Sequence, residues 1–293
     1  MVFVVGCGQV DENRHLDGGP DGPSGDAAPD ARVPVCWGAA FTSPSPVTEL
    51  NTANRDAFLR LSPDQLTAYF SSDVVGAAAI LGGWKSTRTS ATATFTAPVR
   101  LVITNDTAVE MWSPTLTADG LTLYFTRTVA NAQKDIFKAT RAATTDNFSG
   151  LTPVTALNGA SSEEDVYVVP DGSALYFSSD RGNGSTFSIF RAAASGTTFS
   201  PPVEVLADTS LFVNRVVISP DELTMFYQGA NEIHETRRAS KTDAWTLQPA
   251  LAVLGSSNAD HPTWISPDGC HLYFESDRGG VPLNLYSASR TPL

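Results

Sequence analysis

The sequence lacks the short motifs that mark common catalytic and cofactor sites. It has no Walker loop, no GxSxG elbow, no HExxH zinc motif and no CxxC pair. Histidine is also scarce, and the four that occur fall in different kinds of predicted segment: His15, His234, His261 and His271. Because a metal site needs several such ligands to converge, we expect neither a bound metal nor a cofactor.

Basic residues are few. The chain of 293 residues has 19 lysines and arginines against 31 aspartates and glutamates, so its formal charge is -12. Nucleic-acid binding depends on a concentrated basic surface, and we therefore do not expect a nucleic-acid partner. The small number of basic residues also argues against direct binding to an anionic membrane surface. The net negative charge favours solubility.

The first residues contain the one apolar run at the N-terminus, MVFVVGC at residues 1–7, which is too short to span a bilayer. It resembles a bacterial lipobox, in which the cysteine is lipidated and becomes the first residue of the mature protein. A basic n-region is missing, so the native start lies upstream or the segment has been trimmed. We predict that Cys7 is the lipid site. The alternative is a buried β segment that contains a cysteine.

Residues 8–35 are poor in the residues that build a core. From position 9 to about 33 there is no aromatic residue and almost no β-branched one, so the segment cannot bury enough apolar surface to offset the entropy of ordering it. Asp17, Asp21, Asp26 and Asp30 recur at steps of four or five residues, but this spacing does not fit an EF-hand. We interpret residues 8–35 as a disordered acidic tether.

Five copies of one pattern organise the rest of the chain. Each copy has a turn aspartate, and a pair of aromatic residues begins five residues after it. The aspartates are Asp64, Asp119, Asp171, Asp221 and Asp268. The pairs are Tyr69-Phe70, Tyr124-Phe125, Tyr176-Phe177, Phe226-Tyr227 and Tyr273-Phe274. Short β-type runs at a period near fifty predict a β-propeller, with the aspartates as turn formers and the aromatic pairs as core.

Each copy divides into four short strands, the last of which begins at an aromatic residue 22 to 24 positions before the next turn aspartate. Phe41 has this spacing from Asp64, although no earlier strands precede it, and the chain ends before the last copy reaches its fourth strand. We therefore predict an all-β fold over residues 36–293. It is a five-bladed β-propeller of four-stranded antiparallel blades, closed by residues near 41–50, which complete the last blade beside residues 284–290.

The repeat resembles that of the TolB-like β-propellers, which occur in many exported bacterial proteins. The resemblance rests on SPDG, LYFSSDRG and a third strand ending in Ala-x-Arg, and it covers residues 36–293. It is closest around Asp171 and Asp268, whereas the copies around Asp64 and Asp221 lack the Asp-Arg-Gly turn. This resemblance implies an exported protein that works through protein contacts at the cell envelope.

Polar residues enter the predicted innermost strands, which line the central channel of a propeller. They are Asp56, Glu110, Glu163, Glu164, Asp165, Asn214, Asp260 and His261. Together they predict a mostly acidic funnel. As the binding set at the channel mouth we choose Asp56, Glu110, Glu164, Asn214, Asp260 and His261.

Two functions fit such a funnel. The first is a non-catalytic binding or scaffold propeller that meets a protein, peptide or glycan of the envelope by electrostatic complementarity. The second is a glycoside hydrolase, because some five-bladed propellers cleave sugars with two facing carboxylates. The copies are alike, and none carries a distinctive acid-rich motif outside the repeat, so we favour binding and no enzymatic activity. We expect a monomer in the periplasm or at the outer membrane or cell surface, held by a lipid anchor.

Cysteine is rare, with three residues in the chain. With Cys7 assigned to lipid, Cys36 and Cys270 remain in a protein that we expect to reach an oxidising compartment. Cys36 precedes the closing strand and Cys270 follows the first turn of the same blade. We predict a disulfide between them that clamps the ring. The alternative is two unpaired thiols.

Overall fold

The computed structural model describes residues 36–73, 80–182, 186–280 and 282–292. The apolar segment at residues 1–7, its lipid site Cys7 and the tether at residues 8–35 lie outside the described residues. What the sequence indicates for these segments stays a prediction. The described ranges contain the turn aspartate and the aromatic pair of all five repeats.

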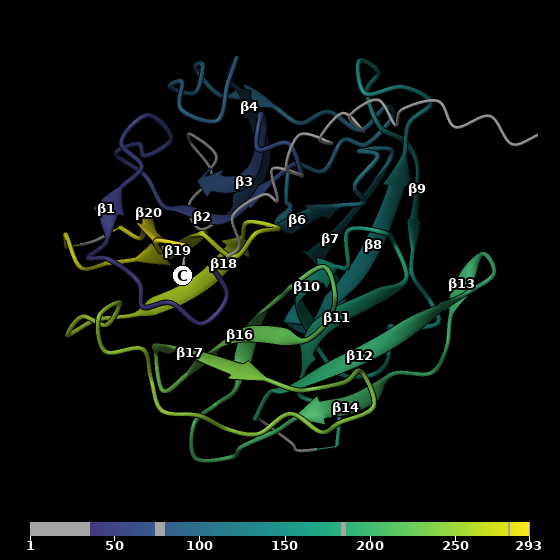
Figure 1. Cartoon of the computed structure of the whole chain (residues 1–293). Helices are drawn as coiled ribbons and strands as arrows, with labels where there is room; N and C mark the ends of the chain where they lie inside the picture. Colours follow the sequence, from purple (N-terminus) through teal and green to yellow (C-terminus); the bar gives the residue numbers. More distant parts are fainter. Residues whose placement is uncertain (1–35, 74–79, 183–185, 281, 293) are drawn as a thin grey trace, which may run out of the picture. The chain divides into compact units, whose positions relative to one another are not determined.

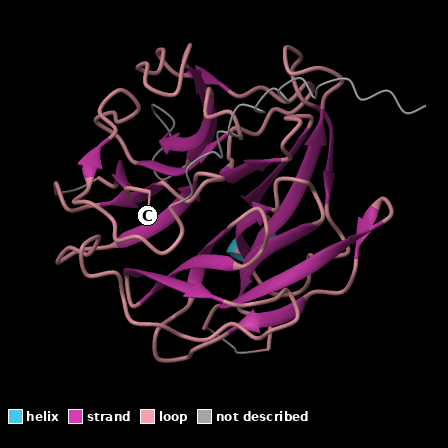
Figure 2. Cartoon of the chain, in the orientation of Figure 1, coloured by secondary structure: helices cyan, strands magenta, loops and turns pink. Residues whose placement is uncertain are grey.

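Strands dominate these ranges, and η1 (Ala130–Ala132) is the one helical element there (Figure 2). They form five antiparallel sheets, one for each repeat. The first contains β2 (Asp56–Leu61), β3 (Thr67–Asp73), β4 (Leu81–Thr87) and β5 (Val99–Arg100). The second contains β6 (Trp112–Leu116), β7 (Thr122–Thr128), β8 (Lys134–Thr140) and β9 (Ser149–Pro153). The third contains β10 (Glu163–Val168), β11 (Ala174–Ser179), β12 (Ser188–Ser195), β13 (Thr198–Phe199) and β14 (Val203–Leu206).

The last two blades differ in their outer edge. The fourth contains β15 (Asn214–Ile218), β16 (Thr224–Gly229) and β17 (Glu232–Arg237). An isolated bridge between His234 and Ala250 takes the place of its fourth strand. The fifth contains β18 (Asp260–Ile265), β19 (His271–Ser276), β20 (Asn284–Ser289) and β1 (Ser45–Pro46).

The innermost strands of the five sheets form a closed ring. Each of β2, β6, β10 and β15 contacts the innermost strand of the next blade, and β18 contacts β2 (Figure 1). The fold is therefore the predicted five-bladed β-propeller. We use the word channel for the space that these five strands surround, and we call its two ends the strand-start end and the turn end, after the first and last residues of the inner strands.

Packing between blades explains the continuous apolar runs of the sequence. Every residue of β2, β11 and β18 is buried, because each sheet is covered on both faces by its neighbours. The phenylalanine of each predicted aromatic pair is at most 1 % exposed: Phe70, Phe125, Phe177, Phe226 and Phe274. The interpretation of these pairs as core is confirmed.

The N-terminal strand closes the ring as predicted. β1 pairs antiparallel with β20, and Ser45 lies opposite Ser287. Phe41 forms a bridge with Arg290, and the backbone N–H of Val47 donates to the carbonyl oxygen of Leu285 at 2.9 Å. The segment that starts the propeller therefore belongs to its last blade. It supplies the fourth strand that the C-terminal repeat lacks.

A disulfide joins Cys36 to Cys270, the pair that the sequence predicts, with the two Cα atoms 4.9 Å apart. The bond links residues 234 positions apart and lies in the blade that β1 completes. In the loop-entropy account, closing so long a loop stabilises the folded chain by about 5 kcal/mol. The ring closure is thus held covalently as well as by β1.

The turn aspartates form the turns between the first and second strands. The carboxylate of Asp119 accepts hydrogen bonds from the Thr117 hydroxyl at 2.6 Å and from the Leu121 N–H at 2.9 Å. The residue after each aspartate has positive φ, and it is glycine in three copies but Gln65 and Glu222 in the others. Glycine adopts this conformation without steric cost, which explains the Asp-Gly dipeptides.

Candidate functional site

A bulge in each inner strand shapes the channel. The pairing of first and second strands shifts register in all five blades. Four residues at the bulge have φ between 46° and 58°: Phe58, Ser113, Asp165 and Arg215. All four stand six positions before their turn aspartate, where the last blade has Pro262. Bulges re-aim side chains, and such strained residues concentrate at functional sites.

Arg215 is the centre of a buried ion cluster that joins four blades. Its Nε lies 3.3 Å from Oδ1 of Asp165 in the third blade, and its Nη1 lies 2.8 Å from Oε1 of Glu275 in the fifth. Its guanidinium carbon lies 4.0 Å from the ring centre of Phe58 in the first blade. One side chain of β15 can touch three other blades because it lies near the axis of the ring.

Glu275 is fully buried in this cluster. Its Oε2 accepts the backbone N–H of Phe58 at 2.8 Å, and its Oε1 lies 3.1 Å from Nδ1 of His261. Burial opposes ionisation, but the charge of Arg215 and the contact with His261 outweigh it and lower the pKa of Glu275 to about 2. The carboxylate is therefore ionised at neutral pH and cannot donate a proton.

A small pocket of about 230 Å³ opens at the strand-start end, beside this cluster. We call it the strand-start pocket. Its lining is Arg55, Phe58, Trp112, Thr126, Lys134, Glu164, Asp165 and Arg215. The Lys134 ammonium lies 3.1 Å from the Glu164 carboxylate and 4.4 Å from the ring centre of Trp112. Arg55 lies over the same ring at 5.3 Å, so Trp112 is flanked by two cations.

This lining corrects the prediction of a mostly acidic funnel. The lining of the strand-start pocket contains two carboxylates and three cations, which come from Arg55, Lys134 and Arg215. The sequence prediction named acids of the innermost strands and did not include these three cations. Glu275 was also missed, although a signal existed: the matching positions of the other copies hold the uncharged residues Ser71, Thr126, Ser178 and Gln228.

Two residues of the predicted binding set, Asp56 and Asp260, are completely buried and do not line the channel mouth. Asp56 accepts hydrogen bonds from the backbone N–H and the hydroxyl of Thr52 at 2.6 and 3.0 Å. Asp260 accepts the same pair of bonds from Ser256 at 2.7 and 2.8 Å. Both carboxylates hold the loop that leads into their inner strand. The prediction that they lie at the channel mouth is therefore wrong.

The other four predicted residues are spread out. Glu164 lines the strand-start pocket, and His261 contacts the ion cluster through Glu275. Glu110 accepts hydrogen bonds from the Trp112 indole at 2.6 Å and the Thr128 hydroxyl at 2.7 Å. Asn214 lies opposite Gln228, and its Oδ1 is buried without a hydrogen-bond partner within the described ranges. The structure thus brings Glu164 and His261 to the channel but not the whole set.

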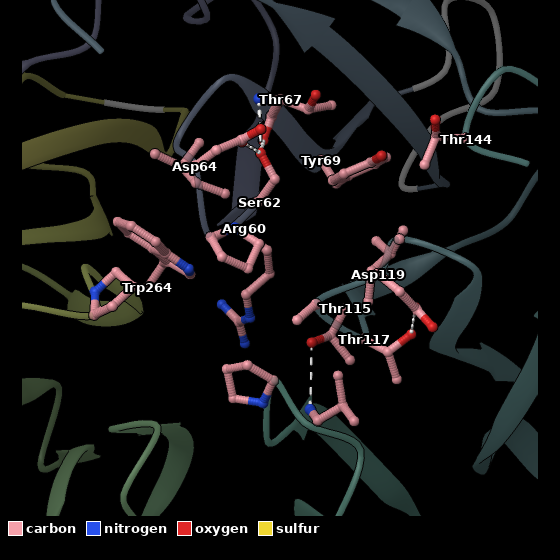
Figure 3. Close-up of a pocket in the computed structure, with 18 of the residues that line it drawn as sticks. Arg60, Ser62, Asp64, Thr67, Tyr69, Thr115, Thr117, Asp119, Thr144 and Trp264 are labelled. Carbon is pink, nitrogen blue, oxygen red and sulfur yellow. Dashed lines mark hydrogen bonds between the residues drawn. The ribbon is translucent and has the colours of Figure 1, made fainter.

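A larger pocket of about 670 Å³ occupies the turn end (Figure 3). We call it the turn-end pocket. The residue before each turn aspartate lines it, and these residues are Pro63, Ala118, Pro170, Pro220 and Pro267. Side chains of the inner strands, among them Arg60, Thr115 and Trp264, form its deeper wall. The channel therefore has a pocket at each end, with different linings.

Comparison of the fold shows that it is shared by proteins of different function. TolB from Acinetobacter baumannii matches over 83 % of this chain with a TM-score of 0.50 and 16 % identity, and the chain spans 56 % of that protein's length. The α-L-arabinofuranosidase PaAbf62A from Podospora anserina, solved with cellotriose, matches over 86 % of this chain and 97 % of its own, with a TM-score of 0.55 and 15 % identity.

The catalytic domain of an α-L-arabinofuranosidase from Coprinopsis cinerea gives a similar result, with a TM-score of 0.54 and 13 % identity over 88 % of this chain and 98 % of that one. No protein-family model and no curated protein matches the sequence. The likeness to a TolB protein agrees with the repeat motifs and shows the TolB-like propeller fold. Because the same fold is found in glycoside hydrolases, it does not decide between binding and catalysis.

No group of three or more histidine, cysteine, aspartate or glutamate residues in the described ranges could hold a metal ion. Nor does any helix within those ranges have the length and apolar character needed to cross a membrane.

Proposed function

We propose that the propeller is a non-catalytic binding module of the bacterial cell envelope, which meets a protein, peptide or glycan partner at the strand-start end of its channel. The observation that carries the proposal is the pairing of the carboxylates there. Glu164 is paired with Lys134, and Asp165 and Glu275 are paired with Arg215. Such paired charges recognise a partner's polar groups, and Glu275, whose pKa is lowered to about 2 by Arg215 and His261, cannot donate a proton.

Glycoside hydrolysis needs one carboxylic acid with a raised pKa beside a second, ionised carboxylate. Burial raises the pKa of Asp56, Asp135 and Glu163. None of the three lines either pocket, and Glu163 is tied to the Arg181 guanidinium at 2.7 Å. This arrangement supports binding over the arabinofuranosidase chemistry that the fold also accommodates.

The aromatic and cationic groups of the strand-start pocket suit recognition of a polar partner. Trp112 is half-buried beside Arg55 and Lys134, and aromatic side chains next to cations are common where proteins bind polar partners. The lining of the pocket carries charges of both signs. Such a surface selects a partner by its pattern of charge, which serves specificity more than affinity.

The location in the envelope rests on the sequence. The lipobox-like run at residues 1–7 and the tether composition of residues 8–35 indicate an exported lipoprotein. A coil of about 25 residues reaches roughly 25 to 30 Å. That length lets a tethered propeller reach partners near the membrane surface, which fits reversible contact better than turnover of a soluble metabolite.

A photo-crosslinking residue at position 134 tests the binding proposal. The full chain carrying it is expressed in a bacterial envelope, and a matched chain carries the same residue at exposed Val253. We expect one dominant adduct from position 134 that is absent from position 253 and is lost when Trp112→Ala is added. Equal labelling from both positions, or adducts unaffected by Trp112→Ala, would contradict the proposal.

A second assay addresses the enzyme alternative. The purified chain is incubated with a set of aryl glycosides that includes arabinofuranosides. We expect no hydrolysis above that of a protein-free control. Hydrolysis that a single carboxylate substitution abolishes would replace the binding proposal by the glycosidase.

A further inference from the structure

Arg60 on β2 is a nearly buried guanidinium in the deep wall of the turn-end pocket, with 5 % of its surface exposed. Its Nη1 donates to the carbonyl oxygens of Leu59 and Thr263, and its guanidinium carbon lies 4.8 Å from the ring centre of Tyr167. In Figure 3 the guanidinium lies between Trp264 and Thr115.

The Nε of this guanidinium is buried without a hydrogen-bond partner in the described ranges. None of the ion pairs between described residues includes Arg60. Burial lowers the pKa of Arg60 to about 10, so the group keeps its charge at neutral pH. The Nε and Nη2 edge of arginine matches the two oxygens of a carboxylate.

The walls of the pocket carry two more cations, Lys85 on β4 and Arg141 after β8. Neither has a carboxylate partner among the ion pairs of the described residues. Two carboxylates also line the pocket, Asp64 and Asp119. Each accepts hydrogen bonds within its own turn, from the N–H of Leu66 and of Leu121 respectively. Among the residues that line the pocket, the buried charge of Arg60 is therefore positive, and the acids belong to the turns.

The rest of the lining is apolar or carries hydroxyl groups. Trp264 and Ile265 of β18, the turn prolines and Tyr167 supply apolar surface, and Thr115 and Thr117 supply hydroxyls. A volume of about 670 Å³ lies within the range of small-molecule pockets. An aromatic wall beside a buried cation fits a ligand with one negative end and an apolar body.

We propose that the turn-end pocket binds a small organic carboxylate through Arg60, with its apolar body against Trp264. The site lies at the end of the channel opposite the strand-start pocket and does not depend on the binding function proposed there. The carboxylate belongs to a free organic acid or to the C-terminus of a short peptide. Phosphate alone, which lacks an apolar body, does not fill the pocket.

Isothermal titration of the full chain with phenylacetate tests the site, with phenylacetamide as the uncharged control. We expect saturable binding of phenylacetate and at least tenfold weaker binding of the amide and of inorganic phosphate. The tripeptide Ala-Ala-Phe, as free acid and as amide, distinguishes the two sources of the carboxylate. If the tripeptide acid binds more tightly than phenylacetate, the natural ligand is the C-terminus of a peptide. If phenylacetate binds more tightly, the natural ligand is a free organic acid.

Variants locate the binding. Arg60→Met removes the charge and keeps much of the volume, and we expect it to weaken phenylacetate binding at least tenfold. Lys85→Gln is expected to weaken it a few-fold. Its matched control is Lys138→Gln, because Lys138 lies opposite Tyr124 as Lys85 lies opposite Tyr69 but does not line the pocket. The control should leave the affinity unchanged.

Since Arg60 also contacts two backbone carbonyls, Arg60→Met could fail to fold. A measurement on the unaltered chain covers this case: nuclear Overhauser effects between the ring protons of phenylacetate and the indole of Trp264. Their presence, with a weaker affinity in Lys85→Gln, supports the proposal. Absence of saturable binding, equal affinity for acid and amide, or bound phenylacetate without contact to Trp264 overturns it and leaves Arg60 a structural residue.

Discussion

The guanidinium of Arg278 lies 2.6 Å from the carboxylate of Asp260, and the pair ties the turn between the second and third strands of the last blade to its innermost strand. Arg278 also lies over the rings of Phe274 and Tyr286 and donates to the carbonyl oxygen of Leu254. The third blade repeats the arrangement with Arg181 and Glu163 at 2.7 Å. The Asp-Arg-Gly turn of the repeat is thus a clamp within a blade.

Removing the acid from this clamp should destabilise the fold strongly. Asp260→Ala leaves Arg278 and the N–H of Ser256 without their acceptor, and losing one partner of a buried pair costs about 3 to 5 kcal/mol. Urea unfolding followed by fluorescence measures the loss. Glu49→Ala, at an exposed position, is the control and should change the stability by less than about 0.5 kcal/mol. A similar small effect of Asp260→Ala would show that the clamp is unimportant.

Replacing Gly269, which follows the turn aspartate of the last blade, should lower the stability of the fold strongly. Gly269 has φ +73°, and a Cβ there would lie 2.5 Å from Cδ2 of Trp37. Gly196 has φ +62°, with nothing within 4 Å of its Cβ position. Gly196→Ala should cost about 1 to 2 kcal/mol for the left-handed backbone alone, and Gly269→Ala clearly more, because the indole must move. Thermal unfolding of the two variants compares them; equal losses would refute the clash.

The disulfide should make the stability depend on redox conditions. Reduction, or the double substitution of Cys36 and Cys270 by serine, should lower the free energy of unfolding by up to about 5 kcal/mol. Urea unfolding with and without reductant measures this. The double variant should not respond to reductant, and a response from it would mean that the effect arises elsewhere.

Lowering the pH should destabilise the protein, because Glu275 becomes protonated and loses its charge. Its pKa falls from 4.5 unfolded to about 2 in the fold, so the unfolded chain binds the proton more tightly. The contribution, of the order of 3 kcal/mol, is complete above pH 4.5 and is lost as the pH falls toward 2. Glu275→Gln should flatten the stability profile in that window when unfolding is measured from pH 6 to 2. An unchanged slope would contradict the assignment.

The repeat pattern was sufficient to predict the ring. The turn aspartates, the aromatic pairs and the position of Phe41 are local features with a constant spacing, and each blade forms mainly from residues close in sequence. Closure by residues 41–50 and the Cys36–Cys270 bond followed from counting strands and cysteines, because a ring with an incomplete first and last copy closes in one way.

The roles of the channel residues depended on the tertiary structure. Asp56 and Asp260 look like channel acids in the sequence, yet both carboxylates are buried and accept hydrogen bonds from the loops that lead into their own strands. Arg215 meets Asp165 and Glu275 only because three blades converge at the axis. Residues 50 to 60 positions apart have no local signal of contact, since their distance is decided by the closure of the whole ring.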